Sequence, residues 1–393
     1  MSINATCGKR ECLTIVKCRY TFLMRDVVQK TLVGLTTPEI SSAVATAAGT
    51  QAYRGKQVAE WLYRRMLPSE GGGAKAQFEK MTDLPNDLRA KLTELYPDQP
   101  LKVGEKHVDS RDGTIKILAR TTMGDHPIEC VLMPDEKRVS VCLSTQAGCP
   151  MACAFCATGT QGLTRNLTAG EIVAQFQVLQ AATERRISHI VFMGMGEPLL
   201  NYDATLRAIR ILNAECGVAM RHITVSTVGI VPNIDKLAAE NLQITLAVSL
   251  HAPTDALRKK LVPVAERYSV ADLIAACRRY ADQTHRRLTF EYVLLKGVND
   301  RPEDARELAA LMRNLPAALN VIPYNPTPVF EQFQRPEASR ITEFRRILEA
   351  AGVTVTQRKE RGQQIAAACG QLVTEANKNR PVKQVLTMIP GAV

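Results

Sequence analysis

From residue 139 onward, apolar runs alternate along the chain with stretches of helical periodicity. The apolar runs cover 139–144, 189–194, 222–228, 243–250, 288–295 and 319–323. The helical stretches cover 169–186, 204–214, 233–241, 270–284, 303–314 and 339–351. Such alternation predicts an α/β fold with a parallel sheet built from βαβ units, whose binding residues follow the C-terminal ends of the strands. About six units are fewer than the eight of a closed barrel. The pattern therefore favours a partial (βα)6 barrel of the TIM type over a doubly wound sheet, although periodicity leaves both open.

The chain before and after these units divides into further segments. Residues 36–105 are predicted to form a small helical domain, with helices that begin at Thr37-Pro38-Glu39, run from Lys56 to Met66, and run from Leu84 to Leu95. The barrel is expected to occupy residues 106–375 and to begin with an antiparallel pair, Ile115–Ala119 and Pro127–Met133. Residues 1–35 are expected to be a poorly ordered extension, and residues 376–393 a C-terminal tail.

The charge balance indicates a polyanionic partner. Fifty Lys and Arg against 39 Asp and Glu give a net charge of +11, and 46% hydrophobic residues exclude a disordered chain. Nucleic acid is the commonest polyanion inside cells, so the basic helical domain is a candidate RNA-binding module. A solvated helical cap would have the same composition.

Neither a membrane span nor a signal peptide is expected. No apolar run reaches the ~20 residues that a membrane span needs. Lys17 and Arg19 interrupt the only apolar stretch near the N-terminus. We therefore expect a cytoplasmic protein, in which the 11 cysteines stay reduced.

Three of those cysteines are spaced as ligands of one metal centre. Cys149, Cys153 and Cys156 form a CxxxCxxC pattern after the first barrel strand. A structural zinc site would need a fourth ligand, usually from a second CxxC or HxxxH pair, and the sequence has no such pair. Three thiolates suit a four-iron cluster that leaves one iron open to a small molecule. Three buried cysteines without chemistry would be unusual at this spacing.

The pattern resembles the signature of the radical S-adenosylmethionine (SAM) superfamily. Similar family motifs follow in order at predicted strand ends: Met193-Gly-Met-Gly-Glu-Pro198, Ser226-Thr-Val-Gly229 and Ser249-Leu-His251. The resemblance implies a [4Fe-4S] cluster on Cys149, Cys153 and Cys156. It also implies SAM as cofactor, with contacts from a set of strand-end residues: Gly196, Glu197, Ser226, Ser249, Leu250, His251 and Asn325.

Two more cysteines narrow the resemblance. Cys142 lies on the strand before the cluster motif, and Cys369 lies in the block Gly362-Gln-Gln-Ile-Ala-Ala-Ala-Cys-Gly-Gln-Leu372. Together with Ile128-Glu-Cys-Val131 and Ile322-Pro-Tyr-Asn-Pro326, they resemble the radical SAM RNA adenine methyltransferases over residues 50–375. That family contains enzymes that methylate adenine carbon 2 in 23S rRNA and tRNA, and a relative that methylates carbon 8.

The resemblance also implies a radical mechanism. Adenine carbon 2 is electron-poor and cannot attack the methyl group of SAM directly as a nucleophile. In the family, one SAM methylates the cysteine that matches Cys369, and a second SAM yields a 5′-deoxyadenosyl radical. This radical takes hydrogen from the S-methyl group, and the methylene radical adds to adenine. The thiolate that matches Cys142 resolves the covalent link and leaves a Cys142–Cys369 disulfide, and Glu129 matches the proton acceptor. The expected partners are 23S rRNA, tRNA and an electron donor such as flavodoxin or ferredoxin. The enzyme is expected to be a monomer.

Several alternatives remain open on the sequence. The carbon-8 enzyme shares all five cysteines, and only Pro198 favours carbon 2. An RNA-binding protein with a structural metal centre would need neither Cys142 nor Cys369, and the same holds for a radical SAM enzyme that activates a glycyl radical. Taken singly, Cys142, Cys369 and His251 could be core residues, and Glu129 could be a solvated strand residue.

Overall fold

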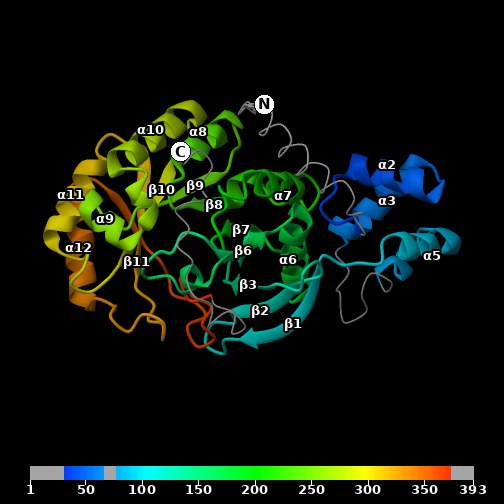
Figure 1. Ribbon diagram of the computed structural model, residues 1–393, viewed down its shortest axis with the longest axis horizontal. Helices are drawn as coiled ribbons and strands as arrows, with labels where there is room; N and C mark the ends of the chain where they lie inside the picture. The colour runs from blue at the N-terminus through cyan, green and yellow to red at the C-terminus, as the bar shows by residue number, and fades with distance from the viewer. Residues whose placement is uncertain (1–30, 66–76, 373–393) are drawn as a thin grey trace, which may run out of the picture.

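The computed structural model describes residues 31–65 and 77–372, which form one large mixed sheet covered by helices, with a group of helices at one side (Figure 1). The sheet has ten strands in the order β1-β2-β3-β4-β7-β8-β9-β10-β11-β12. Their bounds are β1 Leu101–Val108, β2 Ile115–Thr121, β3 Pro127–Pro134, β4 Val139–Cys142, β7 His189–Phe192, β8 Ile223–Thr227, β9 Thr245–Ser249, β10 Leu288–Leu294, β11 Ala317–Pro323 and β12 Thr354–Gln357. In the described residues, β1 and β12 are the two ends of this order, so the barrel is partial.

The sheet changes character at β4. Strands β1 to β4 pair antiparallel, whereas every pair from β4–β7 to β11–β12 is parallel. The parallel strands have buried apolar side chains such as Val141, Ile190 and Leu246, because helices cover their outer face. Their C-terminal ends lie at one edge, where the binding residues were predicted.

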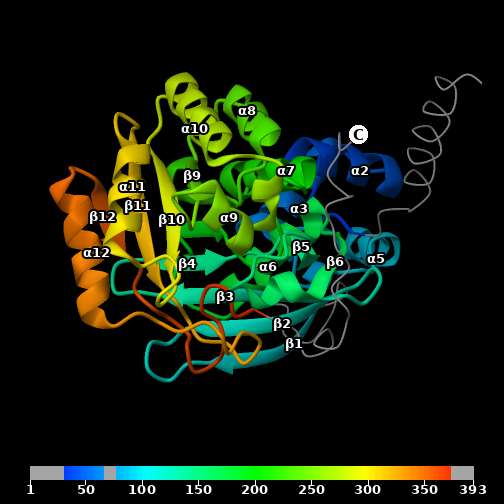
Figure 2. The same ribbon diagram turned by 60° about the vertical axis from the view of Figure 1, so that its left-hand side comes forward.

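Helices connect the parallel strands on the outside of the barrel (Figure 2). They are α6 Ala169–Ala181, α7 Tyr202–Ala214, α8 Val231–Ala239, α9 Asp255–Leu261, α10 Val270–Thr284, α11 Pro302–Met312 and α12 Ala338–Ala350. Six of them confirm the predicted helical stretches, and the predicted strands and the antiparallel pair β2–β3 are also present. The sequence did not predict α9 or β12. Helix α9 has only 7 residues, and β12 has four residues that are mostly exposed, so neither has a clear apolar pattern.

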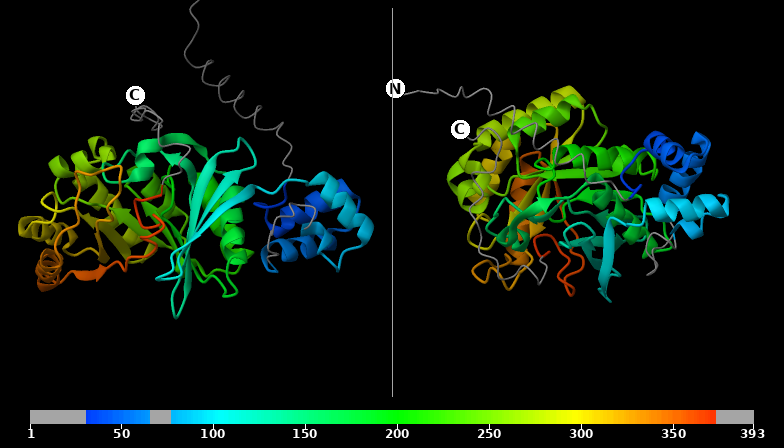
Figure 3. Two further views of the ribbon diagram at one scale, coloured as in Figure 1. Left: turned by 90° about the horizontal axis from the view of Figure 1, so that it is seen from below. Right: turned by 45° about the vertical axis from the view of Figure 1, so that its right-hand side comes forward.

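The N-terminal helices α2 Thr37–Ala48, α3 Ala52–Tyr63 and α5 Asn86–Leu95 lie together beside α6 and α7 (Figure 3). Helices α2 and α3 touch at Gly55, where an added Cβ would lie 2.2 Å from the Cα of Ser41. Glu215, after α7, accepts hydrogen bonds from the backbone N–H and the hydroxyl of Thr37, at 3.0 and 2.6 Å. These contacts fix the helical group against the barrel.

At its borders the helical group differs from the prediction. The predicted helical segment 36–105 ends in strand β1, which joins the sheet instead of the helices. Leu32 and Val33, predicted within the extension, are buried, and an added Cβ on Gly34 would lie 2.6 Å from the backbone of Gly170 in α6. The rest of the extension, residues 1–30, and the predicted tail 376–393 lie outside the described residues.

A separate two-stranded sheet closes the loop that carries the cluster motif. Strand β5 (Gln146–Cys149) pairs antiparallel with β6 (Gly162–Asn166), so the loop between them begins and ends at one place. Gly148 has φ 79°, and an added Cβ would lie 2.0 Å from the carbonyl oxygen of Gly162, so only glycine fits there. In the described residues, no helix combines the length and the apolar character of a membrane span.

Candidate active site

A cavity of about 160 Å³ lies at the C-terminal ends of the parallel strands. Its wall includes most of the residues predicted from the sequence: Cys149, Cys153, Cys156, Gly196, Glu197, Ser226, Ser249, His251, Asn325 and Cys369. They come from the cluster loop, from the ends of β7, β8 and β9, and from the segments after β11 and β12. Residues far apart in the sequence therefore meet where a parallel sheet places its binding loops.

The three cysteines of the cluster motif share this cavity. Burial raises the pKa of the Cys149 and Cys153 thiols, and Cys156 raises it further in both. In the part of the chain that the structure describes, no three His, Cys, Asp or Glu side chains lie close enough to hold a single metal ion. Three thiolates from one loop match the donor set of a four-iron cluster that leaves one iron open to a small molecule.

Glu197, at the end of β7, is a buried carboxylate on the cavity wall. It accepts hydrogen bonds from the backbone N–H groups of Val228 and Leu199 at 2.8 and 3.0 Å. Burial nevertheless raises its pKa to about 7, while these hydrogen bonds lower it. Beside it, Gly196 has φ 103°, and an added Cβ would lie 2.6 Å from the Cβ of Gln146. This site therefore suits a ligand that brings a cationic amine to Glu197 along a bare backbone.

His251 is a buried, neutral imidazole at the end of β9. Its Nδ1 accepts the backbone N–H of Val293 at 3.0 Å, which leaves Nε2 as the protonated nitrogen. Burial and Arg258 lower the pKa of His251 to about 3. The residue has φ 59°, an uncommon conformation for a side chain other than glycine, and its ring lies edge-on to Phe155 at 4.8 Å. His251 can thus donate a hydrogen bond beside the cluster loop without becoming charged.

Asn325 connects the cavity to the loop that carries Cys369. Its Nδ2 donates to the carbonyl oxygen of Cys369 at 3.3 Å, whereas its buried Oδ1 has no hydrogen-bond partner among the described residues. An unpartnered buried acceptor on a cavity wall suits a polar ligand that donates to it. The same loop bonds to the cluster loop, because the N–H of Ala157 donates to the carbonyl oxygen of Gly370 at 2.8 Å.

Cys142 lies in an adjoining cavity of about 70 Å³, which Cys369 also lines. The pKa of Cys142 is raised to about 12, first by burial and then by Cys369, while Arg358 lowers it. Both thiols are free. Cys142 and Cys369 therefore line one cavity, and Cys369 lines both cavities.

Glu129 and Leu250 do not line either cavity. The carboxylate of Glu129 on β3 is buried, and its Oε1 lies 3.1 Å from Nζ of Lys116 on β2. That Nζ also lies 3.4 Å from the carbonyl oxygen of Ala366 in the Cys369 loop. Leu250 is fully buried, and its backbone N–H donates to the carbonyl oxygen of Glu291.

Two arginines at the site were not predicted from the sequence. Arg258 in α9 is buried and donates to the carbonyl oxygens of Val228, Ser249 and Leu250, at 2.6, 3.3 and 3.2 Å. Arg358 directly follows β12 and lines both cavities. Periodicity did not predict helix α9, which carries Arg258, or strand β12, which Arg358 follows, so the sequence contained no signal for either arginine.

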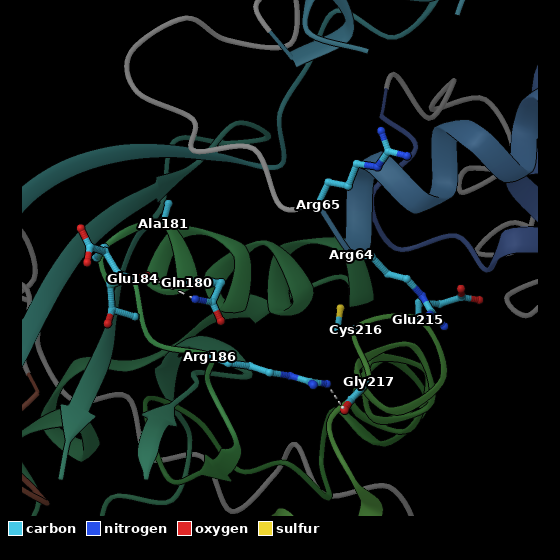
Figure 4. A pocket seen from close by; sticks show the side chains of 11 residues that line it. Arg64, Arg65, Gln180, Ala181, Glu184, Arg186, Glu215, Cys216 and Gly217 are labelled. Atoms are coloured by element: carbon cyan, nitrogen blue, oxygen red, sulfur yellow. Dashed lines mark hydrogen bonds between the residues drawn. The ribbon is translucent and has the colours of Figure 1, made fainter. Parts of the chain in front are cut away.

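A larger cavity, of about 740 Å³, lies between the N-terminal helices and the barrel (Figure 4). Arg64 and Arg65 line it from the end of α3, and Ala181 and Gly217 line it at and beyond the ends of α6 and α7. Helices α6 and α7 lead to the N-terminal ends of β7 and β8, the strands that follow them. This cavity therefore lies at the edge of the sheet opposite the cluster motif. It contains none of the predicted site residues.

Comparisons with known proteins agree with this geometry. Residues 143–309 match the radical SAM superfamily, and residues 30–96 match the ribosomal RNA large subunit methyltransferase N-terminal domain. A protein of Thermosynechococcus vestitus, named a probable dual-specificity RNA methyltransferase RlmN, is 47% identical over 341 residues, which cover 87% of this chain and 97% of that protein. Its counterpart in Symbiobacterium thermophilum is 44% identical over 360 residues, which cover 91% of this chain and 94% of that protein.

A solved structure has the same fold. The crystal structure of a radical SAM methyltransferase from Sphaerobacter thermophilus has 48% sequence identity and a TM-score of 0.81, and the match covers 87% of this chain and 98% of that one. The predicted fold class, with its radical SAM barrel and N-terminal helices, is thereby confirmed. The chain belongs to the RlmN family of radical SAM RNA methyltransferases.

Proposed function

We propose that this SAM-dependent RNA methyltransferase acts on carbon 2 of an adenine in 23S rRNA and in tRNA, through an S-methyl group on Cys369. The observation that carries the proposal is the position of Cys369. It lies on the wall shared by the cavity of the cluster cysteines and the cavity of Cys142. The names of the relatives from Thermosynechococcus and Symbiobacterium, which include the words dual-specificity RNA methyltransferase, support the substrate class.

As a radical SAM protein, the enzyme uses a [4Fe-4S] cluster and SAM. The described residues fit both groups. Cys149, Cys153 and Cys156 supply three thiolates for the cluster, and the buried carboxylate of Glu197 supplies an anion for the amine of SAM. When bound, the cluster supplies the electron that cleaves SAM, and SAM supplies the methyl group. We assign Gly196, Ser226, Ser249, His251 and Asn325 to SAM contacts from the wall, and Leu250 to a backbone role beneath it.

The remaining predicted residues handle the adenine adduct. Cys369 carries the methyl group, Cys142 resolves the covalent link, and Glu129 accepts the proton from the adenine carbon. Glu129 is held beside the Cys369 loop through Lys116, which contacts both Glu129 and the carbonyl oxygen of Ala366. An adenine outside a base stack is the expected substrate, since neither ring carbon is accessible within one.

We further propose that the N-terminal helices contact RNA, that a flavodoxin or ferredoxin supplies the electron, and that the enzyme is a cytoplasmic monomer. The match of residues 30–96 to the N-terminal domain of rRNA methyltransferases supports the RNA-contacting role of the helices. Carbon 2 is favoured over carbon 8 because Pro198 follows Glu197 on the cavity wall.

Mass spectrometry of nucleosides tests the proposal. The reconstituted holoenzyme is incubated anaerobically with SAM, reductant, and either a large-subunit rRNA fragment or tRNA. We expect 2-methyladenosine in both RNAs from the unchanged enzyme and none from Cys369→Ala. The matched control is Cys277→Ala, because Cys277 is a buried cysteine in α10 outside both cavities. A product that co-elutes with 8-methyladenosine, or no methylated adenosine, would reject the carbon-2 assignment.

A further inference from the structure

Arg358 places a guanidinium between the two cavities of the site. Its Nη1 lies 3.2 Å from the sulfur of Met193, at the end of β7, and 4.0 Å from Oε2 of Glu291 on β10. Its backbone N–H donates to the carbonyl oxygen of Val321 at 2.9 Å, which fixes the residue at the end of β12. The side chain is only 23% exposed, so its charge acts within the site.

Cys142 shares these surroundings. It lines the same small cavity as Arg358 and Cys369, and the backbone of Met193 forms a hydrogen bond to its sulfur. Val131 and Met195 pack around it. In this apolar environment burial raises the pKa of the Cys142 thiol to about 12 even though Arg358 lowers it. Formation of the thiolate therefore depends on every nearby group that favours negative charge.

We propose that Arg358 is the positioning residue that supplies the counter-charge for the Cys142 thiolate. The inference deepens the proposed function, on which it rests for the resolving step. In that step the Cys142 thiolate forms a bond to the sulfur of Cys369, and the bond between that sulfur and the methylene carbon breaks. The electron pair passes to the methylene carbon, which takes a proton to become the methyl group of adenine. Only the thiolate can attack in this way, so the cation controls resolution.

Three further charged residues line the small cavity, Lys359, Glu360 and Arg361. Lys359 is exposed to solvent, whereas Glu360 and Arg361 form ion pairs with other residues.

The other charged and titratable groups near Cys142 do not provide the counter-charge either. Cys369, from the loop after β12, and Cys130, from β3, are thiols, and Cys369 raises the pKa of Cys142. Glu291, from β10, is an anion that faces Arg358, and Nδ2 of Asn320 donates to its Oε2 at 2.8 Å. Glu291 therefore orients the guanidinium, while Arg358 is the cation that acts on Cys142 among the described residues.

The test measures how fast iodoacetamide alkylates Cys142 in the holoenzyme across neutral to alkaline pH, by peptide mass spectrometry. In Arg358→Met the midpoint pH should rise by about one unit or more, because a nearby cation favours a thiolate by that order. Arg358→Lys should restore most of the shift. The control is Lys359→Met, the exposed neighbour that lines the same cavity, which should leave the midpoint unchanged. An unchanged midpoint in Arg358→Met would overturn the proposal. If the affinity for SAM falls but the midpoint stays the same, the proposal is overturned as well.

A second readout follows the covalent protein–RNA adduct on denaturing gels. Arg358→Met should form the adduct and resolve it at least about tenfold more slowly at neutral pH, with recovery at higher pH. Rapid resolution at neutral pH would contradict the role of Arg358. The alkylation profile needs no RNA, so the two readouts can fail separately. If the unchanged enzyme forms no adduct with RNA, the proposed function is rejected. If Arg358→Met still shifts the alkylation profile in that case, the role of Arg358 in the charge of Cys142 stands.

Discussion

Cys142 and Cys369 line one cavity, although they come from opposite ends of the parallel part of the sheet. Cys142 lies on β4, the first parallel strand, and Cys369 lies in the loop that follows β12, the last parallel strand. The loop that carries Cys369 reaches back to the first strands (Figure 2). Arg361 donates to Asp135 and to the carbonyl oxygen of Pro134, both at 2.6 Å. Because the barrel is open, this loop can place a residue from the end of the chain against β4.

Arg258 should be a major stabilising residue. Arg258→Met would remove the guanidinium donors to the carbonyl oxygens of Val228, Ser249 and Leu250. The carbonyl oxygen of Leu250 keeps another donor, the N–H of Ala252 at 2.8 Å. The loss of the guanidinium should cost about 3–5 kcal/mol in the free energy of unfolding. Urea denaturation measures this. The control is Arg279→Met, an exposed arginine paired with Asp235, which should cost less than about 1 kcal/mol. Equal effects of the two substitutions would contradict the assignment.

Glu197 should make the protein without SAM less stable as the pH rises. Its pKa is about 7 in the folded chain, against an ordinary value of 4.5 for a glutamate, so the folded state binds more protons than the unfolded state between these pH values. Stability is then lost between pH ~4.5 and ~7, by roughly 3 kcal/mol in total. Urea unfolding across this range should decline less steeply for Glu197→Gln. Parallel curves for the two proteins would show that Glu197 does not titrate in this range.

Lys116 and Glu129 should stabilise the fold as a pair. Both are buried, so Lys116→Met would leave the carboxylate without its cation and cost about 3–5 kcal/mol. Changing Glu129→Gln as well should recover much of that loss, which a double-mutant cycle of unfolding free energies measures. Additive effects of the two substitutions would exclude the coupling.

Gly148 should be required for the cluster loop. Gly148→Ala would force a Cβ to within 2.0 Å of the carbonyl oxygen of Gly162 and disrupt the β5–β6 pair, so the iron content after reconstitution should fall. Gly49→Ala is the control. Gly49, directly after α2, is left-handed with φ 63° and ψ 37°, and nothing lies within 4 Å of its Cβ position. The substitution should therefore cost only the roughly 1–2 kcal/mol of a left-handed residue and leave the iron content unchanged. Equal iron loss in both variants would refute the packing argument.

The sequence could predict the barrel because its strands are buried on both faces and its helices are long enough to show their period. Ile190 and Leu246 are fully buried, for example, in strands that read as continuous apolar runs. Strand β1 was missed for the opposite reason. All its residues after Leu101 are exposed, and charged residues such as Lys102 and Lys106 gave it the appearance of the end of a helical segment.

For the site, motif spacing located Cys149 and Glu197, because their neighbours in sequence are also their neighbours in space. Arg258 and Arg358 act through groups that only the fold brings close, such as the carbonyl oxygen of Val228 and the thiol of Cys142. No spacing along the chain records such contacts. The ion pair of Glu129 with Lys116 likewise depends on the pairing of β2 with β3.

The S-methyl group on Cys369 is the central claim, and deuterium transfer tests it most directly. The holoenzyme is first methylated with SAM that carries a CD3 group, freed of SAM, and then given unlabelled SAM, reductant and rRNA fragment for one turnover. Peptide mass spectrometry should find the label on Cys369 before RNA is added. The 2-methyladenosine formed in that turnover should carry two deuterium atoms in its methyl group. A product without deuterium from an enzyme labelled on Cys369 would show that the methyl group does not pass through this residue.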